Sequence, residues 1–219
     1  MPKEPYTGSD IQHLSGFQAI RKRPGMYVGE RSGDLNVNIL IQEALCISLD
    51  NLLAGQASQL AITLAPDGSA IVADDGDGLS LETLNCGQTL TEVMFTAMHA
   101  GCRYHKNDPE NSHLCGPGMV CVTALSAWLV VDNKRDGFNW QTRFEQGEAC
   151  GPVQQMSPTT ETGLQISFIP DPSIFGDRRL CPDKLRNWFG QLPISLPSGC
   201  RISLVTPQKS TSLFPLTDS

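Results

Sequence analysis

The sequence predicts an α/β two-layer sandwich rather than a doubly wound parallel sheet. Three observations support this prediction. A long helix-like run at residues 35–53 precedes the first two strand-like runs. These two strand-like runs flank the turn sequence Pro66-Asp67-Gly68. A later helical stretch is followed by several strands. With 219 residues, of which 40% are hydrophobic, the chain can bury a full core as one domain, or as one domain with a short appendage.

The first part of the chain is expected to form an arm and then a central helix. Residues 1–15 are polar and rich in Pro, Gly and Ser, which is typical of an arm outside the core, and residues 23–29 are rich in turn formers. Asp34 is a suitable cap for a helix that runs to about Leu53 and ends at Gly55. The residues expected to face the core are Leu35, Ile39, Leu45, Leu49 and Leu52.

A hairpin and a helix-and-strand region are expected to follow. Residues 59–65 and 69–73 read as the two hairpin strands, and the second strand leads directly to Asp74. Helices are expected at 91–100, 119–128 and 182–191, and strands at 129–132, 139–145, 164–169 and 201–205. The polar stretch 101–112 is typical of a mobile lid. The folded unit is thus expected to span residues 16–205, with a disordered tail at 206–219.

Composition narrows the functional classes. A formal charge of −7 argues against direct DNA binding, because phosphate contacts need a clustered positive field, and the basic run at residues 21–23 is short. No apolar run is long enough to span a bilayer and the start lacks a signal-peptide segment, so no membrane contact and a cytoplasmic location are expected. Eight cysteines without a Cys-x-x-Cys pair indicate buried free thiols rather than disulfides or a zinc site.

The run Ala70-Ile-Val-Ala-Asp-Asp-Gly-Asp-Gly-Leu79 is the most informative feature of the chain. An acidic residue at a strand end can accept a hydrogen bond from the adenine amino group, and the two nearby glycines let the backbone pass close beneath the ring. Glu43, on the preceding helix, can then activate water. Together these residues suggest an ATP site.

These motifs resemble the ATPase domain of the DNA gyrase B subunit and its relatives in the GHKL superfamily, over nearly the whole chain. The matching segments are residues 16–29, Glu43 with Asp50 and residues 54–55, residues 74–78, residues 92–93 with 99–101, residues 124–126, and residues 162–163. The resemblance implies the GHKL (Bergerat) ATP-binding fold, with a mixed and mostly antiparallel sheet.

The resemblance also implies residue roles. Glu43 would be the general base that orients water toward the γ-phosphate, and Asp74 would read adenine, with Gly76 and Gly78 close to the nucleotide. The loop at residues 114–118 would present N–H groups to the phosphates. Tyr6 would reach over the nucleotide of a partner subunit, which makes the arm an ATP-dependent homodimer latch. Further nucleotide contacts are implied for Asp50, Leu79, Met94, Leu114, Gly116, Gly118, Met119 and Thr162.

The chain departs from the family pattern at four places. Ile47 stands where the family has the magnesium-binding asparagine, so Mg²⁺ binding is not favoured, and Asn51 is only a weak replacement candidate. Asp77 stands where gyrase has an arginine. The lid loop has Ser112 and His113 in place of its leading glycines, and its Pro117 lacks an N–H. Leu164 lacks a hydroxyl that the family uses to support the adenine-reading aspartate.

These departures leave three hypotheses. The first is a gyrase-B-like domain that binds ATP or ADP, hydrolyses ATP weakly or not at all, and acts as a regulatory or interaction module. The second is an ATPase subunit of a topoisomerase-like assembly, completed by a partner chain that supplies the family's transducer lysine, since 219 residues leave no room for that domain or for complete topoisomerase activity. The third is a binding protein for another molecule, with a vestigial pocket. Whether the chain is an enzyme therefore stays open.

Overall fold

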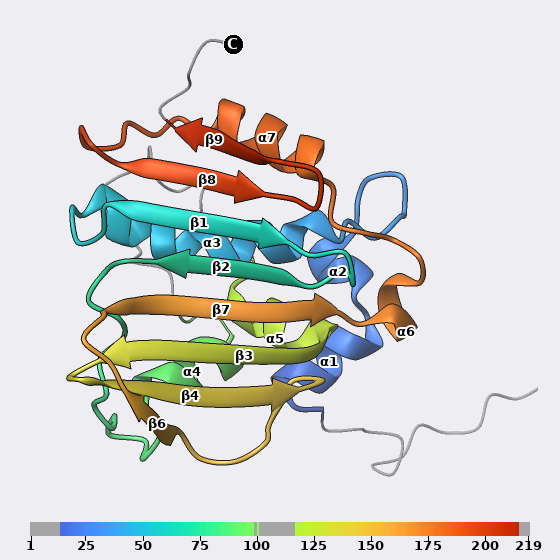
Figure 1. The fold of residues 1–219 in the computed structure, drawn as a ribbon. Coiled ribbons are helices and arrows are strands. Elements are labelled where there is room, and N and C mark those ends of the chain that lie inside the picture. The colour runs from blue at the N-terminus through green and yellow to red at the C-terminus, as the bar shows by residue number, and fades with distance from the viewer. Residues whose placement is uncertain (1–13, 99, 101–116, 215–219) are drawn as a thin grey trace, which may run out of the picture.

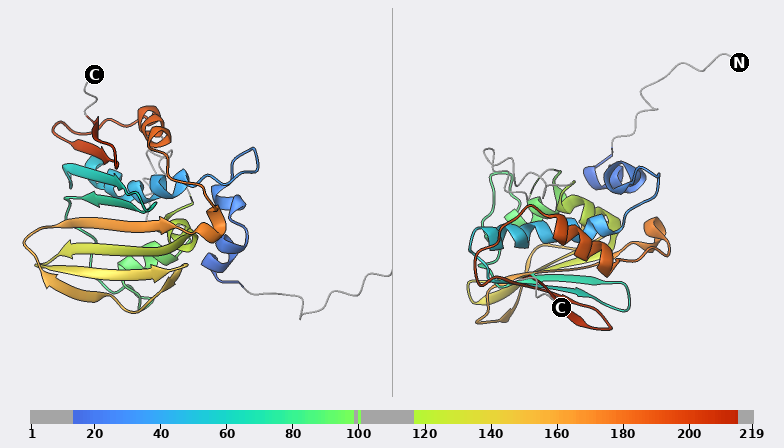
Figure 2. Two further views of the ribbon diagram at one scale, coloured as in Figure 1. Left: turned by 45° about the vertical axis from the view of Figure 1, so that its right-hand side comes forward. Right: turned by 90° about the horizontal axis from the view of Figure 1, so that it is seen from above.

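A nine-stranded sheet and a layer of helices on one of its faces make up the protein (Figure 1). The computed structural model describes residues 14–98, 100 and 117–214. Viewed from above, the helices lie on one side of the strands (right panel of Figure 2). The predicted α/β two-layer architecture is confirmed. The helices are α1 (Gly16–Lys22), α2 (Gly25–Val28), α3 (Asn38–Leu53), α4 (Leu90–Thr96), α5 (Met119–Leu125), α6 (Pro172–Phe175) and α7 (Pro182–Gln191).

The sheet is mixed and mostly antiparallel, as the resemblance implied. Its strands are β1 (Gln59–Leu64), β2 (Ala70–Asp74), β3 (Ser126–Arg135), β4 (Phe138–Glu145), β5 (Glu148–Ala149), β6 (Gln154–Pro158), β7 (Gly163–Pro170), β8 (Arg201–Val205) and β9 (Ser210–Phe214). Their order is β5-β4-β3-β7-β2-β1-β8-β9, with β6 also paired to β4. Among the described strands, β1 and β8 pair in parallel and the other pairs are antiparallel.

The strand directions bring the motif residues to one edge of the sheet. Both β2 and β3 end at the left edge in Figure 1, where β7 begins. The register pairs Ala73 with Gln165 and Lys134 with Gly163, so the ends of β2 and β3 lie on either side of the start of β7. The residues that follow β2 and those at the end of β3 are therefore neighbours in space.

Helix α3 lies at the centre of the helical layer. It packs against β2 and α5, and eleven of its residues are buried. A helix that is apolar on nearly every side is stable only when other elements surround it. Three polar residues of α3 are buried in this interior: Asn38 at its start, and Glu43 and Ser48, which are only 6% and 1% exposed.

Three element boundaries differ from the sequence predictions. Asp34 does not cap α3, which begins at Asn38, because a bridge between Gly29 and Leu35 keeps the preceding chain extended. Helix α5 ends at Leu125 rather than at 128, since the chain from Ser126 pairs with β7. Helix α4 ends at Thr96 rather than at 100, with extended backbone at the next residue.

The tail also differs from its prediction. Residues 210–214, expected to be disordered, form β9, which pairs with β8. The turn-rich segment at 23–29 contains α2, and α1 precedes it with a capping box between Ser15 and Gln18. Short elements α6, β5 and β6 had no sequence prediction because they contain few residues and little periodicity.

The described residues bear on two predictions from composition, the burial of the cysteines and the lack of a membrane-spanning segment. Cys121 and Cys200 are buried free thiols, as expected, and Cys46 is buried too, whereas Cys86 and Cys150 are exposed. Among the helices that the structure describes, none has the length and apolar content that a bilayer crossing requires.

Candidate functional site

A cleft of about 450 Å³ opens at the edge of the sheet where β2 and β3 end. Helix α3, the segment after β2, helix α4 and the end of β3 form its walls. The lining residues are Ile47, Asp50, Asn51, Gln56, Asp77, Gly78, Leu79, Ser80, Leu90, Met94 and Arg135. The structure thus brings four of the predicted nucleotide contacts, Asp50, Gly78, Leu79 and Met94, to one cavity, together with Asn51, the weak candidate for the magnesium ligand.

Asp74 is the last residue of β2, and its carboxylate is buried. Its Oδ2 accepts a hydrogen bond from the hydroxyl of Ser48 (2.5 Å), and its Oδ1 accepts one from the backbone N–H of Gly76 (3.0 Å). Burial raises the pKa of Asp74, and these two hydrogen bonds, together with the nearby Asn51 side chain and Leu164 backbone N–H, partly offset that rise. The result is a rigid acceptor with a fixed orientation.

The backbone around Asp74 is packed too closely for side chains. A Cβ at Gly163 would lie 2.1 Å from the carbonyl oxygen of Asp74, and a Cβ at Gly76 would lie 3.0 Å from its Oδ1. Gly163 also has φ +135°, which L residues rarely adopt. The glycine of the Thr162-Gly163 motif is therefore required by packing, while Thr162 is exposed and does not line the cleft.

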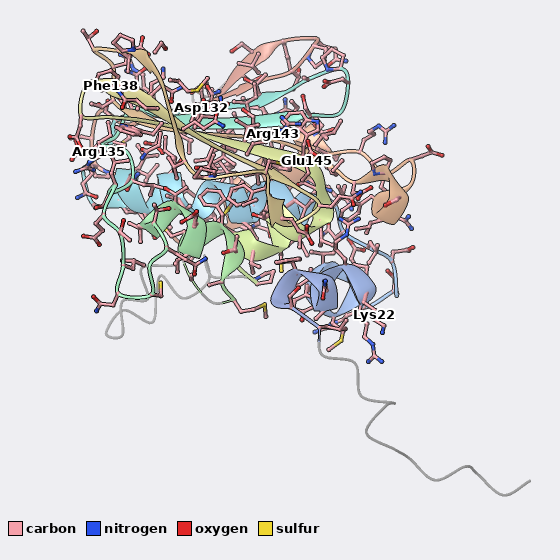
Figure 3. All side chains as sticks on the ribbon, turned by 90° about the horizontal axis from the view of Figure 1, so that it is seen from below. Lys22, Asp132, Arg135, Phe138, Arg143 and Glu145 are labelled. Atoms are coloured by element: carbon pink, nitrogen blue, oxygen red, sulfur yellow. The ribbon has the colours of Figure 1, made fainter. Side chains whose placement is uncertain are left out.

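The segment 77–79 forms the lip of the cleft and is held by β3. Arg135 donates to the carbonyl oxygens of Asp77 (3.3 Å) and Gly78 (3.2 Å). Asn133 exchanges two hydrogen bonds with the backbone of Leu79. In Figure 3, Arg135 and Phe138 lie at one end of the molecule, at the β3–β4 turn, and Lys22 lies at the opposite end. Both Asn133 and Arg135 were missed by the sequence analysis, although a polar residue at an inward position of an apolar strand is a usable signal.

The second aspartate of the motif, Asp75, has a structural role. Its carboxylate accepts hydrogen bonds from the hydroxyl of Ser58 (2.6 Å) and from the backbone N–H groups of Ser58 and Gln59 (2.7 Å each). Partial burial acts to raise the pKa of Asp75, but these hydrogen bonds outweigh it and lower the pKa. Asp75 therefore fastens the motif to the start of β1.

Glu43 lies one turn of α3 before Ile47, at the other end of the site. Its Oε2 accepts the backbone N–H of Gly118 (2.8 Å), the residue that caps α5 with φ +91°. Burial raises the pKa of Glu43 to about 7, although the bond from Gly118 acts in the opposite direction. A carboxylate with such a pKa can exchange a proton near neutral pH, which is what a general base requires.

Helix α4 supplies the remaining wall. Glu92, quoted above as part of the family pattern, accepts the backbone N–H of Thr89 (2.7 Å) and so completes a capping box. The ring of Phe95 stacks on that of Phe144 at 5.9 Å, which fixes α4 against β4. This anchoring presents Met94 to the cleft.

The oxygen ligands in the cleft do not suit Mg²⁺. Ile47 lines the cavity and is 5% exposed, so its apolar side chain occupies the wall one turn after Glu43. Asn51, the weak candidate, directs its side chain to Asp74 instead. Among the described residues, no group of three His, Cys, Asp or Glu side chains could hold a metal ion. Asp50 and Asp77 place negative charge in the lining of the cleft, where it would repel a polyphosphate. Arg135 is the cation in this lining.

The remaining predicted residues lie away from the cleft or outside the described part of the chain. Met119 is buried as the first residue of α5 and does not line the cavity. Tyr6, Leu114 and Gly116, together with the predicted lid at 101–112, fall outside the described residues.

Comparison with known proteins gives a consistent result. No family model matches the chain. The DNA gyrase B subunit of Thermotoga maritima is 35% identical over 216 residues, which cover 96% of this chain and 34% of the relative. The gyrase B protein of Mycobacterium tuberculosis is 37% identical over 174 residues, which cover 79% of this chain and 26% of the relative. The chain thus spans about a third or less of the length of these curated relatives.

A solved structure matches the fold as well. The 43K ATPase domain of Thermus thermophilus gyrase B, crystallised in complex with an aminocoumarin, superposes with a TM-score of 0.76 at 30% identity. The match covers 91% of this chain and 51% of that one. On these grounds the chain is a homologue of the N-terminal ATPase domain of the DNA gyrase B protein.

Proposed function

We propose that this chain is a gyrase-B-like adenine-nucleotide-binding domain that binds ATP or ADP, hydrolyses ATP weakly or not at all, and acts as a regulatory or interaction module. The observation that carries this proposal is the contrast between Asp74 and Ile47. Asp74 accepts hydrogen bonds from Ser48 and Gly76 next to Asn51 of the cleft wall, whereas Ile47, which lines the cleft, presents no oxygen one turn after Glu43.

The proposed purine end comprises Gly78 and Leu79 of the cleft lining and, next to them, Asp74 and Gly76. The Asp74 carboxylate would accept from the adenine amino group, because the hydrogen bonds from Ser48 and Gly76 hold it in one orientation. Leu79 and Met94 offer apolar surface to the ring. Adenine nucleotide therefore fits the residues at this end.

The phosphate end consists of Glu43, Ile47 and Gly118. Mg²⁺ prefers near-octahedral oxygen coordination, so an isoleucine at this position does not favour it. Asp77 adds negative charge at the rim. These features support binding without efficient metal-dependent hydrolysis.

Calorimetric titration with ATP and a nonhydrolysable analogue, with and without Mg²⁺, tests the proposal. We expect binding of both nucleotides with an affinity that Mg²⁺ changes by less than about twofold. The variant Ile47→Asn is expected to make the affinity depend on Mg²⁺. The matched control Ile41→Asn changes the same residue type on α3 at a position that does not line the cleft. Brisk Mg²⁺-dependent turnover by the wild-type protein, abolished in Glu43→Ala, would refute the claim of lost hydrolysis.

A second candidate function is an ATPase completed by a topoisomerase-like partner chain. The observation that favours it is Glu43, whose pKa of about 7 and bond to Gly118 suit a general base. This candidate predicts that turnover is near zero for the chain alone and rises at least tenfold when the partner is added. An unchanged rate across gyrase-like partners eliminates it.

Thermal-shift measurements separate these candidates from binding of another molecule. A ligand that binds only the native state raises the melting temperature. We expect ATP and ADP to raise it, and a lack of response to ATP, ADP and adenosine would favour a vestigial pocket. The proposed partners are an adenine nucleotide, a second copy through the arm at residues 1–15, and a topoisomerase-like protein in the cytoplasm. With a formal charge of −7, direct DNA binding forms no part of the proposal.

A further inference from the structure

Strand β3 places a polar side chain where its pattern calls for an apolar one. Leu129, Val131 and Asn133 alternate along the inward face of β3, and Asn133 is 2% exposed. A buried carboxamide is costly unless its donor and acceptor are both satisfied. The partners of Asn133 therefore indicate why the side chain is tolerated.

Both partners belong to one residue of the cleft wall. The Oδ1 of Asn133 accepts the backbone N–H of Leu79 (2.8 Å), and its Nδ2 donates to the carbonyl oxygen of Leu79 (3.0 Å). Because the oxygen must face the N–H and the nitrogen must face the carbonyl, the carboxamide has a single suitable orientation. The side chain thus replaces the two hydrogen bonds that a neighbouring strand would give to Leu79.

The neighbouring residues complete this arrangement. A Cβ at Gly78 would lie 2.4 Å from the Oδ1 of Asn133 and 3.1 Å from the carbonyl oxygen of Lys134. Gly78 therefore lets the segment approach β3 closely enough for the bonds to form. Arg135, on the same face of β3, donates hydrogen bonds to the carbonyl groups of Asp77 and Gly78, the two residues before Leu79.

We propose that Asn133 is a positioning residue for the purine end: it fixes the backbone of Leu79 against β3 and so sets the width of the cleft for a purine ring. This inference rests on the proposed function, since it takes an adenine nucleotide as the ligand. Asn133 acts through Leu79 and does not itself line the cleft.

The test compares Asn133→Leu with Val131→Ala in the full chain. The first variant removes both hydrogen bonds and keeps the number of side-chain heavy atoms, whereas the second weakens the core from the same face of the same strand and leaves both hydrogen bonds to Leu79 in place. We expect Asn133→Leu to weaken ADP binding about tenfold relative to Val131→Ala, after both are measured by calorimetry at a temperature where each is folded. Equal affinities in the two variants would overturn the inference.

A second readout does not depend on nucleotide binding. Hydrogen exchange of the Leu79 amide, followed by NMR without ligand, should be slow in the wild-type protein and in Val131→Ala, and at least tenfold faster in Asn133→Leu. If the wild-type protein binds no adenine nucleotide, the proposed function fails, and the exchange rates still decide whether Asn133 fixes Leu79. Unchanged exchange in Asn133→Leu would overturn that positioning role.

Asn133→Asp covers the case in which the leucine variant does not fold. A protonated aspartate keeps one donor and one acceptor, but an ionised one cannot donate to the carbonyl of Leu79. The ratio of wild-type to variant affinity for ADP should therefore grow at least threefold as the pH rises from 5 to 8. A ratio that stays constant over this range would contradict the inference.

Discussion

The two ends of the cleft differ in how completely their polar groups are paired. At the purine end, Asp74 accepts hydrogen bonds from Ser48 and Gly76, and the backbone of Leu79 is held at both its N–H and its carbonyl by Asn133. At the phosphate end, the hydrogen bond that Glu43 accepts within the described part of the chain comes from Gly118, burial raises the pKa of Glu43, and Ile47 presents carbon to the cavity.

In the proposed site, base recognition and phosphate contact would therefore rest on separate structural supports. The purine end is built by β2, β3 and β7, which are locked in one sheet. The phosphate end depends on the meeting of two helices, α3 and α5. Substitutions on a helix can therefore change the phosphate end while the sheet keeps the purine end intact.

We expect the strongest effect from a change in the packing of the purine end. Gly163→Ala should lower the free energy of unfolding by about 3 kcal/mol or more, because the new Cβ would lie 2.1 Å from the carbonyl oxygen of Asp74 at φ +135°. Urea denaturation measures this loss. Gly87→Ala is the matched control, since Gly87 also has a positive φ (+81°) but a Cβ added there would meet no atom within 4 Å. The control should lower the free energy of unfolding by only about 1 to 2 kcal/mol. Equal losses in the two variants would mean that the packing of Gly163 against Asp74 adds nothing to the cost of its positive φ.

The next effect lies at the phosphate end and depends on pH. The pKa of Glu43 is raised from 4.5 to about 7 in the folded protein, so protonated Glu43 stabilises the fold. This contribution is fully present below pH 4.5 and is lost as the pH rises through 7, by up to about 3 kcal/mol. Glu43→Gln cannot ionise, so its stability relative to wild type should increase across this window.

Unfolding free energies of both proteins between pH 4.5 and 8 test this expectation. Contributions from other groups, including the raised pKa of Asp74, cancel in the difference between the two proteins. A difference that stays flat with pH would show that Glu43 is ionised in the folded state throughout, and the contrast between the two ends would then be weaker than the structure indicates.

Asp74→Asn probes the purine end through its charge. An asparagine has one acceptor oxygen where the aspartate has two, so its NH₂ group takes the place of an oxygen that accepts from Ser48 or Gly76, and one acceptor near the adenine amino group is lost. We expect nucleotide affinity to fall by about 2 kcal/mol, which is roughly thirtyfold. Asp75→Asn is the matched control, because that neighbouring carboxylate accepts its hydrogen bonds from Ser58 and Gln59, at the start of β1. Comparable losses of affinity in the two variants would argue against adenine reading by Asp74.

The sequence predicted the parts of the site whose geometry is local. The strand that ends at Asp74, the two glycines that follow it and the helix that carries Glu43 each occupy one short segment, so their spacing alone was informative. Ser48 and Asn133 were missed because their partners lie 26 and 54 residues away, and only the packing of α3 and the register of β3 bring them together.

The fold shows the same division between local and distant causes. The hairpin β1–β2 and helix α7 match their predictions closely, since a turn sequence and a proline mark them in the sequence. Asp34 was expected to cap α3, but its carboxylate pairs with Arg178 at 3.0 Å, a contact between distant segments. The end of α5 at Leu125 likewise depends on a distant segment. Asp171, the residue after β7, donates its backbone N–H to the carbonyl of Leu125.

The weakest effect is expected at the rim, where the two ends meet. Asp77 is exposed and lines the cleft, so Asp77→Arg changes the charge beside a bound polyphosphate by two units. At such an exposed position the gain in ATP affinity should be only about 1 kcal/mol at low salt, and it should shrink as salt screens the charges. Asp177→Arg makes the same change of net charge on an exposed residue beyond α6 and should leave the affinity unchanged. Adenosine, which has no phosphates, should bind equally well to all three proteins. If Asp77→Arg strengthened adenosine binding as much as ATP binding, the rim would act on the purine end rather than on the phosphates, and the two ends would not be independent.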